Sequence, residues 1–247
     1  MQGLMSDYFT HASTLDKLQE ENKGLGILIG VAGATGAGKT SLLNALLEHP
    51  ELLPSSSTEA ATATVCRIAW NHDNTPGNEF RAKIKFRSLE AVKIELDEVL
   101  TAVSDRKALR QQEFEDEDER IEAIDERSDF ISQRMGKICA VWDLDEREIE
   151  DVDCTVESVV GANKQIVDLL GSELSIYCSD PDQFSTEVKP YLDSTPTPDG
   201  IIAWPLIEEV RVYVKSEVLK HGIVLVDLPG LSDMVRALGI PVLILFG

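Results

Sequence analysis

Eight residues near the N-terminus have the types and spacing needed to bind a nucleotide phosphate. The run Gly33-Ala-Thr-Gly-Ala-Gly-Lys-Thr40 is a complete G-x-x-x-x-G-K-[ST] motif. Glycines allow the backbone to curl until successive N–H groups point toward phosphate oxygens. We expect the Lys39 ammonium to reach the β- and γ-phosphates and the Thr40 hydroxyl to bind Mg²⁺. The run therefore predicts a phosphate-binding loop.

The residues on either side supply the elements that such a loop needs. An apolar stretch of strand length, 25–31, precedes it, and a helix-forming stretch, 41–48, follows it. Strand, glycine loop and helix in this order is the setting in which the motif indicates nucleotide binding, because a helix N-terminus attracts negative charge. The expected nucleotide-binding residues share this loop and the first turn of the helix: Gly33, Ala34, Thr35, Gly36, Ala37, Gly38, Lys39, Thr40 and Ser41.

A second candidate group lies near the other end of the sequence. The run 223–226 is continuously apolar and leads into Asp227-Leu-Pro-Gly230. Such a run is typical of a central parallel strand covered on both faces, and open α/β sheets bind ligands at the C-terminal tips of their strands. We therefore expect Asp227 to lie beside the phosphate loop and to hold Mg²⁺, directly or through water. Gly230 allows a backbone N–H to approach the γ-phosphate closely.

A third group lies on the small, polar segment 53–64, which follows the phosphate-loop helix. One of its threonines is a candidate for a side chain that closes on Mg²⁺ and the γ-phosphate. Thr62 is our choice, with Thr64 and Thr58 as alternatives, and a plain Ser/Thr-rich loop is the competing interpretation. Lys39 and Thr62 are then the expected catalytic residues. The expected metal ligands are Thr40, Thr62 and Asp227.

Bulk properties narrow the class of protein. The 247 residues, 43% hydrophobic and 27% charged, have ordinary globular composition and are enough for one large domain. A net charge of −21 argues against direct binding to nucleic acid. The four scattered cysteines lack C-x-x-C spacing and indicate reduced thiols. No apolar run is long enough to span a bilayer, and we expect an intracellular protein, cytoplasmic or nuclear.

The order of strand and helix patterns predicts an α/β P-loop NTPase fold with three layers, α/β/α. We expect a mostly parallel sheet with antiparallel additions. Segments 64–70 and 80–87 resemble a hairpin, and 209–215 alternates like a strand that pairs antiparallel with the Asp227 strand. Apolar residues at helical spacing predict a helical insert over about 88–200. The basic face of 80–87 is expected to be solvated and to protect the sheet edge.

Together these motifs resemble the dynamin-like large GTPases, most closely the nuclear GTPase SLIP-GC type and its fungal relatives. The resemblance is carried by the run 33–47, by Leu-Leu-Pro-Ser at 52–55, by Ala-Thr-Ala-Thr at 61–64 and by the run 224–233. It implies a partial dynamin-type GTPase domain over 25–233 that binds guanine nucleotide and hydrolyses GTP to GDP and phosphate with Mg²⁺. It also implies a homodimer that pairs across the nucleotide face.

One feature of GTPases is absent. Guanine is usually read by an [NT]-K-x-D motif on a strand after the one that ends in Asp227, and nothing after Gly230 supplies it. Asn163-Lys164 has the first two letters but precedes that strand, and we expect it to be part of a helix. We expect a truncated product, with an N-terminal helical segment at 1–24 and an atypical tail at 234–247. Two alternatives stay open: a truncated, non-catalytic GTPase-like interaction module, and an ATP-dependent small-molecule kinase.

Overall fold

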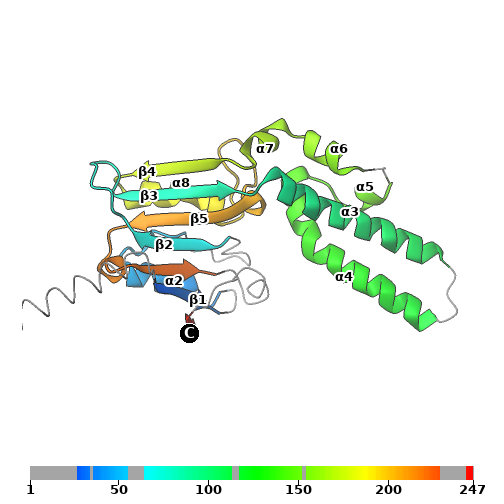
Figure 1. The fold of residues 1–247 in the computed structure, drawn as a ribbon, viewed down its shortest axis with the longest axis horizontal. Helices are drawn as coiled ribbons and strands as arrows, with labels where there is room; N and C mark the ends of the chain where they lie inside the picture. The colour runs from blue at the N-terminus through cyan, green and yellow to red at the C-terminus, as the bar shows by residue number, and fades with distance from the viewer. Residues whose placement is uncertain are drawn as a thin grey trace, which may run out of the picture.

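The computed structural model of the protein describes residues 27–33, 36–54, 64–112, 117–151, 154–228 and 243–246. A sheet with helices packed on it forms one part of the molecule, and a helical arm extends from one end of the sheet (Figure 1). The expected N-terminal helical segment, 1–24, lies outside the described residues, as does most of the tail 234–247. None of the described helices is both long and apolar enough to cross a membrane.

Seven described strands form a single sheet. In spatial order they are β4 (Glu173–Cys178), β3 (Phe80–Phe86), β5 (Ile207–Val214), β2 (Cys66–Trp70), β6 (Ile223–Asp227), β1 (Ile27–Ala32) and β7 (Leu243–Phe246). β1 runs parallel to β6 and β7, and β2 runs parallel to β5. The pairs β2–β6, β3–β5 and β3–β4 are antiparallel. The sheet is therefore mixed and open, and a parallel group surrounds the phosphate loop.

Two expected strand pairings are wrong. β2 and β3 do not form a hairpin, because β5 lies between them. β5 is not the neighbour of β6 either, since β2 takes that place. The alternation of buried and exposed residues in β5, with Val210, Val212 and Val214 buried, identifies the face that enters the core. This alternation does not specify which strand lies beside β5, because any strand whose side chains alternate with the same period of two can place its apolar residues on the same face of the sheet.

The main core lies between the sheet and two helices, α2 (Lys39–Leu46) and α8 (Pro181–Leu192). α2 packs against β1 and β6, and α8 packs against β3, β4 and β5. The large side chains that fill this layer are almost completely buried: Leu43, Leu47, Leu52, Ile68, Ile84, Phe86, Phe184, Val210 and Val212. Full burial of each large apolar side chain contributes about 1.5–3 kcal/mol. This packing holds α2, and with it the phosphate loop, against the sheet.

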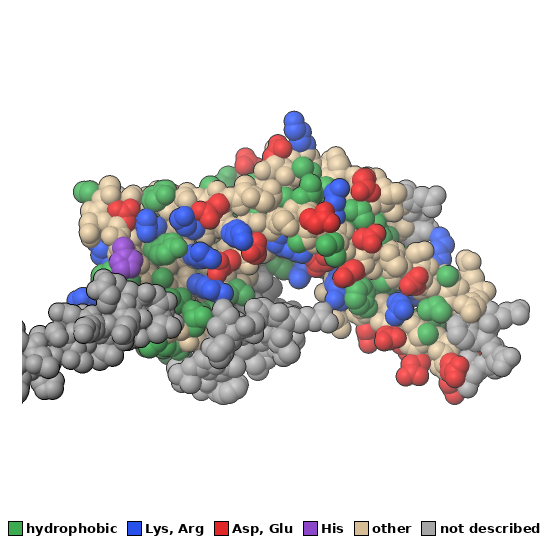
Figure 2. Space-filling model, viewed as in Figure 1, with side chains coloured by type: hydrophobic (Ala, Val, Ile, Leu, Met, Phe, Trp, Pro, Cys, Tyr) green, Lys and Arg blue, Asp and Glu red, His purple; other side chains and the backbone are tan. Residues whose placement is uncertain are grey.

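The face of β3 and β5 that points away from this core carries charged side chains, and basic and acidic groups lie side by side there (Figure 2). Each basic residue of the row 81–87 pairs with an acidic side chain: Arg81 with Asp73, Lys83 with Glu173, Lys85 with Glu208 and Arg87 with Glu95. β3 is an interior strand, since β4 lies outside it. The expectation that this row protects a sheet edge is therefore wrong, and acidic neighbours neutralise the row.

The helical arm, residues 89–169, is built on two long antiparallel helices, α3 (Leu89–Gln111) and α4 (Glu117–Trp142) (Figure 1). Three short helices, α5 (Glu146–Asp151), α6 (Val156–Gly161) and α7 (Lys164–Leu169), lead the chain back to the sheet. α3 begins after Ser88, whose side chain accepts a hydrogen bond from the Ala91 N–H. The arm has an apolar core of its own: Val92, Leu96, Val99, Val103, Ile131, Ile138, Val159 and Val160. The segment 88–200 thus contains this arm followed by β4 and α8, which pack with the sheet.

Candidate nucleotide-binding site

The phosphate loop lies between the end of β1 and the start of α2. Gly36 and Gly38 adopt φ values of +78° and +82°, in the left-handed region where residues with side chains are strained. Gly38 is the N-cap of α2, and no described side chain caps this helix end by a hydrogen bond. Backbone N–H groups at a helix N-terminus attract anions, because they lie at the positive end of the helix dipole. The loop is therefore shaped and polarised for a phosphate.

Lys39 is the first residue of α2, and its side chain reaches back across the loop. Its ammonium Nζ donates a hydrogen bond to the carbonyl oxygen of Gly33 at 3.1 Å. Gly33 follows the last residue of β1, so this contact spans the loop from the helix to the strand. Gly36, Ala37, Gly38 and Ser41 are exposed. The cation thus lies beside a solvent-accessible loop, where a phosphate would meet it.

Thr40 and Asp227 form the polar centre of the site. The Thr40 hydroxyl donates a hydrogen bond of 2.8 Å to the carboxylate Oδ2 of Asp227. Thr40 is 8% exposed and Asp227 3% exposed. Asp227 is the last residue of β6 and stands beside Val31 of β1 in the parallel register. The sequence prediction that Asp227 lies beside the phosphate loop is therefore confirmed.

A neutral thiol lies on the other side of Asp227. Cys66 at the start of β2 is the cross-strand partner of Asp227 and is buried. Burial, reinforced by the negative charges of Asp227 and Glu209, raises the pKa of Cys66 well above its ordinary value. The thiol therefore stays protonated at neutral pH.

The remaining site residues expected from the sequence divide into two groups. Ala34, Thr35, Thr58, Thr62 and Gly230 lie outside the described residues. The structure brings together the rest of the expected set: Gly33, Gly36, Ala37, Gly38, Lys39, Thr40, Ser41 and Asp227.

Thr64, an alternative to Thr62, is 5% exposed at the entrance to β2. Its hydroxyl donates a hydrogen bond of 3.5 Å to the carbonyl oxygen of Trp204. Trp204 begins the 3-10 turn η1 (Trp204–Leu206), which packs against α4 of the arm. Thr64 therefore links the entrance of β2 to the base of the arm.

Asn163-Lys164 has a structural role. The Asn163 side chain accepts hydrogen bonds from the Gln165 and Ile166 N–H groups and caps α7. Lys164 is the first residue of that helix. The prediction that this pair is part of a helix is confirmed by this capping role.

Sequence reasoning missed one polar residue close to the site. Asn44 lies four residues after Thr40 on α2 and is 1% exposed. Its side-chain amide makes two hydrogen bonds with the backbone of Leu53. The sequence does contain a signal for this residue, which is a single amide inside the otherwise apolar run Leu42-Leu-Asn-Ala-Leu-Leu47. A buried amide needs hydrogen-bond partners, so such a residue is expected to make specific contacts.

Comparison with known proteins places this geometry in a family. The sequence profile of the Dynamin family matches residues 29–238. This chain belongs to the dynamin family. The match runs from β1 through the segment after β6, and so includes the phosphate loop, Thr40 and Asp227. The fold is accordingly that of an α/β P-loop NTPase, and the chain contains a dynamin-like GTPase domain.

Two curated relatives are similar over most of the chain. The nuclear GTPase SLIP-GC of Mus musculus is 28% identical over 213 residues, which are 84% of this chain and 25% of the relative. The protein of the same name from Homo sapiens is 27% identical over 226 residues, again 84% of this chain and 25% of the relative. The chain thus spans about a quarter of the length of the curated relatives it matches.

Solved structures of bacterial dynamins are also similar. Two chains, both described as part of an oligomerised bacterial dynamin pair that senses and tethers membranes over long range, match 91% of this chain. They are 21% and 20% identical to it, with TM-scores of 0.43 and 0.40. Only 22% and 21% of those chains are covered. Membership of the family therefore rests on the sequence profile.

Proposed function

We propose that this chain binds GTP and hydrolyses it to GDP and phosphate in a Mg²⁺-dependent reaction. The observation that supports this most is the hydrogen bond between Thr40 and Asp227, residues 187 positions apart in the sequence. A hydroxyl and a carboxylate that meet beside an uncapped helix N-terminus form the donor set expected for Mg²⁺ on a bound phosphate. Guanine nucleotide is the ligand class of the family to which the chain belongs.

The proposed role of each residue follows from its position around the phosphate loop. The N–H groups at the start of α2 and the Lys39 ammonium bind the phosphates and neutralise their charge. Thr40 and Asp227 would hold Mg²⁺, and Mg²⁺ would supply positive charge between phosphate oxygens. In this proposal Thr62 approaches the metal and the γ-phosphate from its own segment, and Gly230 provides a backbone N–H to the γ-phosphate. These last two roles rest on the sequence motifs.

The domain boundaries, the pairing of two copies and the cellular location are also proposed. Residues 25–233 would form the GTPase domain, with 88–200 as its helical insert. Two copies would pair across the nucleotide face, as the resemblance to dynamin-like GTPases implies. The curated relatives are named as nuclear GTPases, which supports a nuclear location over a cytoplasmic one.

A titration with fluorescent GTP in Mg²⁺, competed with unlabelled GTP and ATP, tests the proposal. Lys39→Ala removes the ammonium beside the loop and should abolish binding. Lys85→Ala is the matched control, because Lys85 pairs with Glu208 on an exposed part of the sheet and should leave affinity unchanged. Release of phosphate, measured on the same samples, reports turnover.

The outcomes separate the proposed GTPase from its alternatives. Displacement by GTP but not ATP, with phosphate release that Lys39→Ala removes, supports a GTPase. Binding without release would favour a non-catalytic interaction module. Preference for ATP, with transfer of the phosphate to a small acceptor, would favour a kinase. A folded protein that binds neither nucleotide overturns the proposal.

A further inference from the structure

The two described helices that pack on the sheet, α2 and α8, lie on the same face of it. Both contribute to the main core, which also contains Ile68, Ile84 and Val210 from the strands. The opposite face of β2, β3, β4 and β5 carries mostly polar and charged side chains that are exposed or half-buried. In α/β folds helices usually cover both faces of the sheet. This open face is therefore a candidate surface for contact with another molecule.

A row of three cations crosses the open face. Lys83 of β3 stands opposite Arg211 of β5, and Arg211 stands opposite Arg67 of β2, in the register of the paired strands. Paired residues point their side chains to the same face, and neighbouring strands lie about 4.7–4.9 Å apart, so the row is about 10 Å long. The side chains of Lys83, Arg211 and Arg67 are 44%, 52% and 34% exposed. We call these three residues the cross-strand row.

The cross-strand row has a surplus of positive charge. Glu209 contacts both Arg67 and Arg211, at 2.7 and 2.6 Å, and Glu173 contacts Lys83 at 3.0 Å. Three cations thus share two carboxylates. Each arginine has five N–H donors, whereas one carboxylate offers about four acceptor positions. The pair of arginines around Glu209 can therefore bind further carboxylates from outside.

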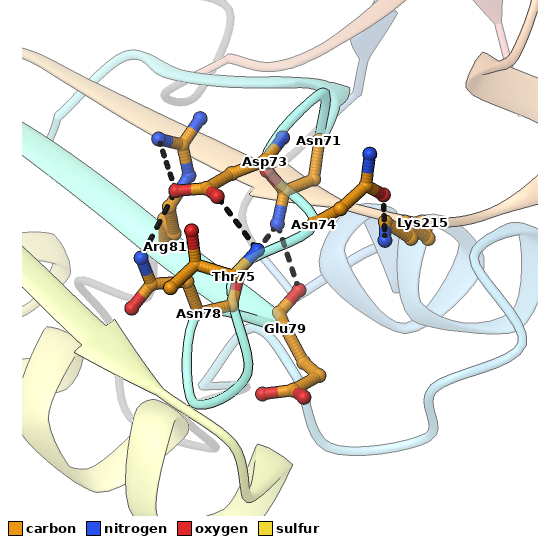
Figure 3. A network of polar contacts seen from close by, with 8 residues as sticks. All are labelled: Asn71, Asp73, Asn74, Thr75, Asn78, Glu79, Arg81 and Lys215. Atoms are coloured by element: carbon orange, nitrogen blue, oxygen red, sulfur yellow. Dashed lines mark hydrogen bonds and ion pairs between the residues drawn. The ribbon is translucent and has the colours of Figure 1, made fainter.

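The loop 71–79 between β2 and β3 bounds the cross-strand row on one side (Figure 3). Asp73 of this loop pairs with Arg81 at 3.4 Å and accepts a hydrogen bond from the Asn78 amide at 2.9 Å. Asn74 accepts a hydrogen bond from the Lys215 ammonium at 2.7 Å. The loop thus engages the cations at this end of the open face. The surplus charge of the face is concentrated in the cross-strand row.

The helical arm has the opposite charge. Residues 89–169 contain 24 acidic and 10 basic residues, a net charge of −14. Ile131 and Ile138 place one side of α4 in the arm core. The other side carries exposed carboxylates at intervals of three, four and three residues, which share one face of a helix. We call these residues the acidic stripe: Glu119, Glu122, Glu126 and Asp129. At 1.5 Å per residue the stripe is about 15 Å long.

We propose that the cross-strand row binds the acidic stripe of a second copy of this chain. Successive carboxylates of the stripe are about 4.5–6 Å apart along the helix, close to the distance between strands, so a helix laid across the strands brings a carboxylate to each cation. Figure 2 shows basic side chains over the sheet and acidic side chains over the arm on one face of the molecule. Two copies related by a two-fold axis therefore place each arm on the other's sheet. This contact requires no nucleotide and is separate from pairing across the nucleotide face.

Analytical ultracentrifugation of the whole chain, with and without a GTP analogue, tests the proposal. The dissociation constant of the dimer is measured for the parent, Arg211→Glu, Glu122→Lys and the double variant. Each is measured in about 0.1 M and about 1 M salt, where the Debye length is about 10 Å and about 3 Å. Lys189→Glu and Glu187→Lys are matched controls, because they make the same charge changes at exposed positions of α8, on the other face of the sheet. Lys39→Ala reports any contribution of the nucleotide face, and melting temperatures verify that each variant is folded.

We expect the parent to form a dimer without nucleotide that is at least about tenfold weaker in the higher salt concentration. Each single charge reversal should weaken the dimer about tenfold, because it replaces an attraction by a repulsion. The double variant should return to within about threefold of the parent, since the reversed charges attract each other again. The two control variants and Lys39→Ala should leave the dissociation constant within about twofold.

A parent that stays monomeric in both salt concentrations overturns the inference. So does a dimer that neither charge reversal weakens, or a double variant that is weaker than both single variants. A dimer that forms only with the GTP analogue and is lost in Lys39→Ala would support pairing across the nucleotide face and overturn this contact. Assemblies larger than a dimer would contradict the two-fold arrangement, because contacts that are not reciprocal form open chains.

Discussion

The hydrogen bond between Thr40 and Asp227 can be measured without any nucleotide. Thr40→Val keeps the branched shape of the side chain and removes the hydroxyl that donates to the Asp227 carboxylate at 2.8 Å. A hydrogen bond to a charged group contributes about 1.5–3 kcal/mol to folding, and both residues are more than nine-tenths buried. We therefore expect Thr40→Val to lower the free energy of unfolding by about 2 kcal/mol.

A double-mutant cycle isolates this contact from other effects of the substitutions. The free energy of unfolding is measured in urea for the parent, Thr40→Val, Asp227→Ala and the double variant. With a slope of about 3 kcal/mol per molar urea, the loss in Thr40→Val moves the midpoint by roughly 0.7 M. We expect the second substitution to cost less when the first is present, with a coupling energy of about 1.5–3 kcal/mol.

The control for this cycle is Ser41→Ala, on the same turn of α2 but exposed. It should change stability by less than about 0.5 kcal/mol. A coupling energy near zero between Thr40 and Asp227 would refute the reasoning, because the two side chains would then not be held together in the free protein. The proposed Mg²⁺ site would in that case have to be assembled by the ligand itself.

Further predictions concern the arm and the buried thiol. Ile131→Ala, at a 0% exposed position in the arm core, should cost about 2–5 kcal/mol in urea unfolding. Ser88→Ala removes the N-cap of α3 and should cost only about 1 kcal/mol; an equal loss for the two would contradict a packed arm core. At pH 8 a thiol reagent should label exposed Cys139 and leave buried Cys66 unlabelled until the protein unfolds, as mass spectrometry can show. The pKa of Cys66 in the folded protein is raised above its ordinary value of 9.0. The protonated thiol therefore makes its full contribution to the free energy of unfolding below pH 9, and this contribution declines as the pH rises further. A free energy of unfolding that rises above pH 9 in the parent, relative to Cys66→Ala, would contradict this.

The local backbone conformation and the buried strand at the site could be predicted from the sequence. The glycines of the phosphate loop predict a tight, left-handed backbone, and Gly36 and Gly38 adopt positive φ. Apolar continuity before Asp227 predicts a buried strand, and β6 ends at that residue with its last positions buried. These features depend on backbone sterics and on the period of apolar residues over a few positions. A short stretch of sequence is enough to specify them.

The sequence did not show in the same way which strands and which charged side chains pair with one another. The alternation in Ile207–Val214 predicts a strand, but the place of β5 between β2 and β3 depends on which strands complete the sheet around it. The basic row of β3 suggested an exposed edge, and the tertiary structure instead places acidic side chains from β4 and other segments against it. The pair of Lys85 and Glu208 joins residues 123 positions apart in the sequence. The type of a side chain alone does not show which of several chemically equivalent acidic residues will pair with it.

The phosphate loop, the strand that carries Asp227 and the family of the motifs can all be inferred from the amino-acid sequence. Three contacts emerge only from the folded chain: Thr40 donates to Asp227, acidic side chains neutralise the basic row, and Asn44 pairs with the backbone of Leu53. The difference lies in the range of the forces involved. Turn geometry and apolar period act between near neighbours in the chain, whereas a buried hydroxyl, carboxylate or amide must be satisfied by whatever group the fold brings to it.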